Sequence, residues 1–75
     1  MQIRVTLMGA LKAHSPPGGT VELPENGTVA DVLAALAIDS AAIQTVMRNG
    51  RPEPDHTVPL AADDELTILP PVGGG

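Results

Sequence analysis

Apolar and polar side chains alternate near both ends of this chain. The pattern covers residues 2–8 and residues 65–69. Its apolar members are Ile3, Val5 and Leu7 in the first segment and Leu66 and Ile68 in the last. A period of two is typical of a strand with one buried face. We therefore predict a strand in each segment, and because both are apolar we expect them to pair at the centre of a sheet.

Two shorter segments also indicate strands. Residues 20–23 alternate, and a loop over residues 9–19 with a Pro-Pro-Gly-Gly run joins them to the first strand. This arrangement predicts a hairpin with a long loop. Residues 44–48 predict a third strand, with Val46 facing inward.

A tight turn follows the third predicted strand. Asn-Gly, here Asn49 and Gly50, is typical of a two-residue hairpin. Two prolines occur soon after it, so the return strand is expected to be short or at a sheet edge. We place that strand at Thr57 and Val58.

The segment after residue 28 predicts the one main helix. Thr28 and Asp31 have the spacing of a capping box. The helix pattern ends at residues 39–40, and residues 41–43 could add another turn. The apolar stripe on its face consists of Val29, Val32, Leu33 and Leu36.

The predicted order is β-β-α-β-β-β. One helix with a single apolar stripe can cover one face of a mixed sheet of four or five strands, which is an α+β architecture. We expect one domain over residues 1–69 and a flexible Gly-Gly tail over residues 70–75.

Composition narrows the functional classes. The chain has 75 residues, no aromatic residue, no cysteine and a net charge of −5. Its core must therefore be aliphatic, and it offers no thiolate ligand or nucleophile. An acidic chain without aromatic platforms argues against nucleic-acid binding. No signal peptide or membrane-spanning run is present, so we expect a cytoplasmic protein that binds no membrane.

Isolated polar residues offer no catalytic or metal site. Asp63, Asp64 and Glu65 are adjacent acids in a turn, and we expect them to be solvated rather than to bind a metal. His14 and His56 each stand alone in a loop. The chain also lacks the GxxxxGK[ST] and GxGxxG phosphate-binding motifs, so we expect a protein that is not an enzyme by itself.

The C-terminal run of residues 70–75 is Pro-Pro-Val-Gly-Gly-Gly. Glycines have no side chain to pack, and prolines favour an extended backbone. Six extended residues reach roughly 20 Å. We interpret the run as a thin arm whose functional group is the Gly75 carboxylate. The alternative at this point is a tail without function or the scar of a truncation or linker.

The whole chain resembles the ubiquitin-like fold and, within it, the MoaD/ThiS family of bacterial sulfur carriers. A terminal Gly-Gly directly after an apolar strand, in a chain of this size and order, carries the resemblance. The Pro-Pro-Val spacer favours the molybdopterin type, the small subunit of molybdopterin synthase. The matching residues are Asn49-Gly50, Pro59-Leu60, Asp63-Asp64-Glu65 and the run from Leu66 to Gly75.

The resemblance implies a mechanism and partners. An E1-like enzyme of the MoeB/ThiF type would adenylate Gly75 with ATP and magnesium, and this chain would bind no cofactor itself. A sulfurtransferase or cysteine desulfurase would supply sulfur for a thiocarboxylate. A large synthase subunit of the MoaE type would receive the arm.

The resemblance also implies roles for the residues near the arm. Gly74 and Gly73 would give steric clearance. Partner docking and channel entry would involve Pro71 as well as an apolar patch of Val72, Leu69 and Leu60, each of which could instead be ordinary core or edge residues.

Other functions fit the same residues. The sulfur could go to thiamine thiazole, to thiolated tRNA or to a secondary metabolite. The chain could be a protein modifier that forms isopeptide bonds through Gly75, or an interaction module with an idle tail.

Overall fold

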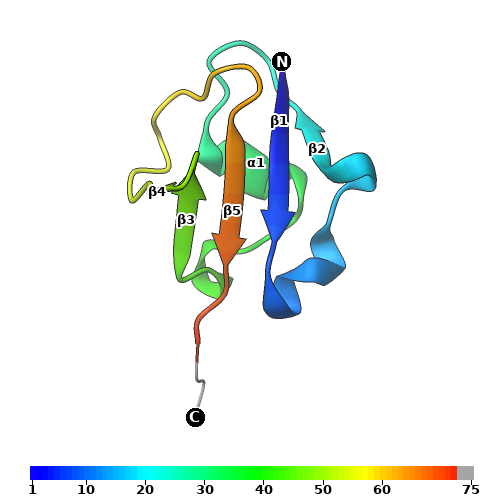
Figure 1. Ribbon diagram of the computed structural model, residues 1–75, viewed down its shortest axis with the longest axis vertical. Helices are drawn as coiled ribbons and strands as arrows, with labels where there is room; N and C mark the ends of the chain where they lie inside the picture. Colours follow the sequence, from blue (N-terminus) through cyan, green and yellow to red (C-terminus); the bar gives the residue numbers. More distant parts are fainter. Residues whose placement is uncertain (73–75) are drawn as a thin grey trace.

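The computed structural model describes residues 1–72. It contains a five-stranded mixed sheet in the order β2-β1-β5-β3-β4, with the helix α1 across one face (Figure 1). The predicted ubiquitin-like α+β fold is thus confirmed. The strands are β1 (Gln2–Leu7), β2 (Thr20–Glu22), β3 (Thr45–Arg48), β4 (Arg51–Pro52) and β5 (Glu65–Leu69), and the helix is α1 (Val29–Ala35).

The first and last strands lie side by side in the middle of the sheet, as predicted. They pair in parallel, with Val5 opposite Leu66 and Leu7 opposite Ile68. Antiparallel partners flank them, β2 beside β1 and β3 beside β5. The strand β5 is therefore held on both sides along its length.

Three short 3₁₀ helices lie in the connections. They are η1 (Gly9–His14), η2 (Pro17–Gly19) and η3 (Ser40–Ala42). The first two fill the loop predicted between the first two strands, and Leu11 anchors η1 in the core. The third corresponds to the extra turn proposed after the helix.

The helix α1 begins at the predicted capping box. The Thr28 hydroxyl accepts a hydrogen bond from the Asp31 backbone N–H at 3.2 Å, and the Asp31 carboxylate accepts one from the Thr28 N–H at 2.9 Å. These two bonds satisfy donors that have no partner inside the helix. The stripe residues Val29, Val32 and Leu33 are buried, and Leu36 is half-buried.

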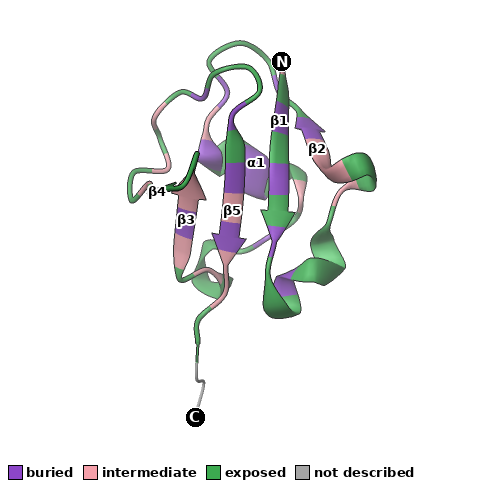
Figure 2. Cartoon of the chain, in the orientation of Figure 1, coloured by how far each residue is buried: buried purple, intermediate pink, exposed green. Residues whose placement is uncertain are grey.

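The core between sheet and helix is aliphatic, as the composition requires. Figure 2 shows the buried residues on the inner positions of the strands and on α1. Ile3, Leu66 and Ile68 are fully buried. The strand alternation places these side chains on the helix side of the sheet.

The return strand after the Asn-Gly turn differs from the prediction. It is β4, directly after the turn, with Arg51 opposite Arg48 and Pro52 opposite Met47. Thr57 and Val58, where we expected it, are not in a strand. Thr57 instead donates to the Asp55 carboxylate from its backbone N–H and its hydroxyl, at 2.9 and 2.6 Å.

The hairpin geometry explains this correction. Asn49 and Gly50 both have positive φ, 51° and 83°, which suits a tight two-residue turn. Such a turn pairs the residues on either side of it at once. Pro52 is accommodated because β4 is at the edge of the sheet, where a missing N–H costs no ladder bond.

The main chain leaves the sheet after Leu69, where β5 ends. The division into a domain of residues 1–69 and a flexible tail of residues 70–75 stays a prediction. Among residues 1–72, no helix is both long and apolar enough to cross a membrane.

Candidate functional site at the end of β5

The end of β5 is tied to the chain on both sides. The Met8 N–H donates to the Ile68 carbonyl at 3.1 Å, and the Gln44 N–H donates to the Leu69 carbonyl at 2.8 Å. The last described residues therefore begin from a fixed point of the sheet. They leave the molecule at the end opposite the N-terminus (Figure 1).

Pro70 packs closely against Gly9. A Cβ built on Gly9 would lie 3.0 Å from the Pro70 Cγ, and Gly9 has a φ of +55°. A larger residue here would be strained and would push against the proline. This contact fixes the direction in which the chain leaves β5.

Exposure rises along this segment. Leu69 and Pro70 are half-buried, Pro71 is exposed, and Val72 is 87% exposed. A valine with so little contact is available to a partner, since it contributes little to the core. The predicted site residues Gly73, Gly74 and Gly75 lie outside the described residues.

Leu60 is placed elsewhere. It is 5% exposed and belongs to the core, and its N–H donates to the Gly27 carbonyl at 2.7 Å, beside the start of α1. It precedes β5, whereas Leu69 and Val72 follow it. The structure therefore does not bring Leu60 into one patch with them, and the core burial left open by the sequence is what it shows.

Asp64 is the polar residue whose role the sequence did not reveal. We expected it to be solvated, but it is 8% exposed. Its carboxylate accepts hydrogen bonds from Arg48 Nε at 2.9 Å, Asn49 Nδ2 at 2.9 Å and the Ala61 N–H at 2.8 Å. Asn49 Oδ1 in turn accepts from the Glu65 N–H at 2.9 Å. The turn before β5 is thereby fastened to the β3–β4 hairpin.

The charge of Asp64 suits these donors. Burial raises the pKa of its carboxyl, but the hydrogen bonds from Ala61, Asn49 and Arg48 outweigh burial, and the net pKa lies below the ordinary value. The group is therefore ionised at neutral pH. Its role in this arrangement is structural, because its donors Arg48, Asn49 and Ala61 join the β3–β4 hairpin to the loop before β5.

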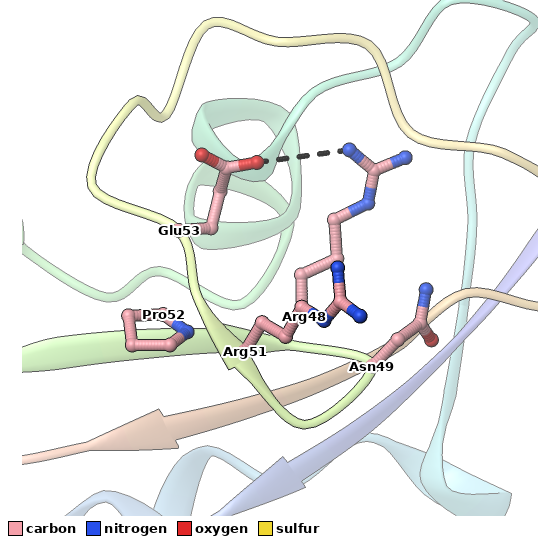
Figure 3. Close-up of a pocket in the computed structure, with 5 residues that line it drawn as sticks. All are labelled: Arg48, Asn49, Arg51, Pro52 and Glu53. Atoms are coloured by element: carbon pink, nitrogen blue, oxygen red, sulfur yellow. Dashed lines mark ion pairs between the residues drawn. The ribbon is translucent and has the colours of Figure 1, made fainter.

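A hollow of about 470 Å³ lies next to this network (Figure 3). Glu53 lies 3.7 Å from Arg48, which also contacts Asp64 at 2.8 Å. The Arg48 charge is therefore already balanced by two carboxylates. The lining residues are Arg48, Asn49, Arg51, Pro52 and Glu53.

No arrangement for catalysis appears in this hollow. Its lining contains no hydroxyl or thiol nucleophile. Within residues 1–72, no three His, Cys, Asp or Glu side chains cluster in a way that could hold a metal ion.

A sequence model of the ThiS family matches residues 5–75. The chain belongs to the ThiS family. The match covers nearly the whole chain and includes the terminal glycines. A comparison with curated proteins gives no significant match.

Solved structures similar to this ThiS family member include a small archaeal modifier protein. SAMP1 from Haloferax volcanii has 28% identity and a TM-score of 0.75, with complete coverage of both chains. A second structure of H. volcanii small archaeal modifier protein 1 has 28% identity and a TM-score of 0.73, over 95% of this chain and 98% of that one.

A third similar structure is a complex of subunits 1 and 2 of the molybdopterin-converting factor from Helicobacter pylori 26695. It has 21% identity and a TM-score of 0.64 over the full length of both chains. This likeness shows the shared fold. Family and fold together support a sulfur carrier or a protein modifier. The small carrier proteins of this family are generally non-catalytic.

Proposed function

We propose that this protein is a sulfur carrier whose Gly75 holds sulfur as a thiocarboxylate. We further propose that it acts in molybdopterin biosynthesis, as the small subunit of molybdopterin synthase. The observation that carries the proposal is that the ThiS family match extends through residue 75. The C-terminal segment in this match follows β5, whose end is held by hydrogen bonds on both sides.

The chemistry follows from the carboxyl group. A free α-carboxyl has a pKa of about 3.3–3.7, so Gly75 is ionised at neutral pH. A carboxylate is a poor electrophile and must be activated before sulfur can attack. An E1-like partner of the MoeB/ThiF type supplies that activation with ATP and magnesium. A sulfur nucleophile then forms the carbon–sulfur bond, and AMP leaves with the electrons of the broken carbon–oxygen bond.

The described residues before the tail favour delivery of the C-terminal acid group into another protein. Pro71 and Val72 are exposed, while Pro70 is seated against Gly9. Proline restricts the backbone, and the glycines that follow have no Cβ to clash with a narrow channel. These features support the proposal that the acid group is delivered to another protein.

The partners follow from the same proposal. The similar Helicobacter pylori structure is a complex in which two subunits of molybdopterin-converting factor are bound to each other. By analogy, this chain would bind a large subunit of the MoaE type. A sulfurtransferase or cysteine desulfurase would supply the sulfur.

The proposal predicts that tail variants lose sulfur loading but keep the fold. The variants are Gly74→Val and a chain extended by one residue after Gly75. Ala62→Val is the matched control, because it adds bulk at an exposed loop position before β5. Loading is measured by intact mass and folding by thermal unfolding. Normal loading of either tail variant would refute the role of the terminal glycines.

A pull-down experiment separates the sulfur acceptors. Recovery of a molybdopterin-synthase large subunit would support the proposed pathway, whereas recovery of a thiazole synthase would support thiamine synthesis.

Deletion of Gly74 and Gly75 tests whether the tail has a function. Unchanged partner binding and pathway output after this deletion would favour an interaction module with an idle tail.

A protein modifier is the second candidate function. The observation in its favour is the similarity to the two structures of small archaeal modifier protein 1. High-mass conjugates that disappear on deletion of Gly75 would support it. A thiocarboxylate without such conjugates would support the carrier.

A further inference from the structure

Asparagine followed by glycine occurs twice in this chain, at Asn26-Gly27 and at Asn49-Gly50. In such a pair the backbone nitrogen of the glycine can attack the side-chain amide carbon of the asparagine and close a succinimide ring. Glycine favours this attack because it has no side chain to obstruct it. The two pairs are therefore candidate sites of spontaneous deamidation, and the structure places them in different surroundings.

The pair at residues 26–27 is blocked at the attacking nitrogen. Gly27 is buried, and its N–H donates to the Pro24 carbonyl at 3.0 Å. A Cβ built on Gly27 would lie 2.8 Å from the Leu23 Cβ, so this backbone is closely packed. The Gly27 carbonyl also accepts a hydrogen bond from the Leu60 N–H at 2.7 Å. Attack by the Gly27 nitrogen would require this turn to leave the core.

The pair at residues 49–50 has a free attacking nitrogen. Gly50 is exposed at the turn between β3 and β4, and a Cβ built on it would meet no atom within 4 Å. Among residues 1–72, the Gly50 N–H has no acceptor within hydrogen-bond distance. Asn49 is also exposed and lines the hollow shown in Figure 3. Water and base can therefore reach both partners of the reaction.

The side-chain amide of Asn49 is held by two hydrogen bonds. Its Nδ2 donates to Asp64 Oδ1 at 2.9 Å, and its Oδ1 accepts from the Glu65 N–H at 2.9 Å. Asp64 is itself fixed by Arg48 and by the Ala61 N–H. Ring closure must turn the amide carbon toward the Gly50 nitrogen, and the two bonds oppose that movement. The network around Asp64 therefore restrains a pair that is otherwise free to react.

We propose that Asn49 is a site of spontaneous deamidation in this protein and that Asp64 restrains the reaction. A base removes the proton of the Gly50 N–H, and the nitrogen forms a bond to Asn49 Cγ. The Cγ–Nδ2 bond breaks with its electrons on nitrogen, which takes up a proton and leaves as ammonia. Water then adds to one of the two ring carbonyls and breaks its bond to the ring nitrogen. The products are aspartate or isoaspartate, without oxidation or reduction.

Either product weakens the attachment of the turn before β5. A carboxylate at residue 49 replaces the donor to Asp64 and brings two negative charges together. Isoaspartate also lengthens the main chain by one carbon within the turn that pairs Arg48 with Arg51. This inference concerns how long the network stays intact, and it does not depend on the sulfur-carrier function.

The test incubates the folded natural chain in mildly alkaline buffer made with isotope-labelled water. Peptide mapping then measures the label at each asparagine, and an isoaspartyl methyltransferase detects isoaspartate. We expect conversion at Asn26 to be about tenfold slower than at Asn49, because the Gly27 N–H must first leave a buried hydrogen bond. Equal or faster conversion at Asn26 would overturn the inference.

The variant Asp64→Ala tests the restraint, because it removes the acceptor of Asn49 Nδ2 and adds no asparagine. We expect conversion at Asn49 to become about tenfold faster, which corresponds to about 1.4 kcal/mol for the lost charge-assisted hydrogen bond. Asn26 is the internal control, since general unfolding would accelerate both sites. Equal acceleration of both sites, or Asn49 that stays intact in both proteins, would overturn the role of Asp64.

The consequence is measured separately in Asn49→Asp, which has the aspartate product from the start. We expect its urea midpoint at neutral pH to be lower than that of the natural chain, because the carboxylates of residues 49 and 64 then repel each other. Equal midpoints would reject the proposed effect of the modification on the turn before β5.

Discussion

Arg48 and Asp64 are joined by two contacts to one carboxylate oxygen. Arg48 Nε donates to Asp64 Oδ2 at 2.9 Å, and Nη2 lies 2.8 Å from the same oxygen. The two residues are 16 positions apart in the chain. Their contact fixes the turn before β5 to the β3–β4 hairpin, and so sets where β5 begins.

Replacement of Asp64 by Asn should destabilise the protein. The change leaves Arg48 without one of its carboxylate partners. It also places the NH₂ group of the new Asn, a donor, next to the N–H donors that the Asp64 carboxylate accepted from. We expect a loss of about 2–3 kcal/mol in the free energy of unfolding, measured by urea denaturation. The neighbouring Asp63→Asn is the matched control, because Asp63 is exposed. Equal losses in both variants would contradict this account.

The stability of the protein should fall in acid through the same residue. The pKa of Asp64 is lowered in the folded state from its ordinary 3.8, with its hydrogen bonds outweighing the effect of burial. The stabilisation is therefore present above pH 3.8 and is lost as the pH falls through the folded pKa.

Asp64→Asn should show a shallower loss of stability below about pH 4 than the natural chain, because it lacks this ionisation. The measurement is the urea midpoint from about pH 6 downward. Asp55→Asn serves for comparison, since the hydrogen bond from the Thr57 hydroxyl lowers the pKa of Asp55 as well. A pH profile of Asp64→Asn that parallels the natural chain would contradict the assignment.

The sequence predicted the elements that local patterns determine. Alternation marked β1 and β5, and the spacing of Thr28 and Asp31 marked the start of α1. These signals depend on residues close together in the chain, so each can be interpreted without knowledge of its neighbours in space.

Two features needed the three-dimensional structure. The burial of Asp64 depends on Arg48 and Asn49, which are distant in the chain, and three adjacent acids gave no sign of it. The return strand β4 is short and at the edge of the sheet, as the prolines predicted, but we placed it after them at Thr57 and Val58. The tight Asn-Gly turn instead pairs Arg51 with Arg48 directly.

Leu60 and Val72 should separate core from docking surface. Leu60→Ala should lower stability by about 2–5 kcal/mol, because Leu60 is 5% exposed and its removal leaves a cavity. Val72→Ala should change stability by less than about 0.5 kcal/mol, because Val72 is 87% exposed. Thermal unfolding measures both effects.

Binding to a large synthase subunit should depend on Val72, although stability does not. Val72→Ala should weaken this binding, measured by titration calorimetry with folded protein. Full affinity in the Val72 variant would remove this residue from the proposed docking surface.

Gly9 should be sensitive to an added methyl group. Gly9→Ala strains a φ of +55° and places a Cβ 3.0 Å from Pro70 Cγ, so we expect a loss of about 1–3 kcal/mol. Gly18→Ala is the matched control, with a φ of +69° and no atom within 4 Å of the added Cβ. The Gly9 variant should lose more stability and should also shift the NMR signals of Pro70. Equal effects would mean that the contact with Pro70 is unimportant.

The most direct test of the account is the intact mass of the protein after incubation with an E1-like adenylating enzyme, ATP, magnesium and a sulfur source. We expect a product in which sulfur replaces one oxygen, located at Gly75 by fragmentation and absent without ATP. Unchanged mass with an enzyme that loads another ThiS family carrier in the same assay would contradict the sulfur-carrier function.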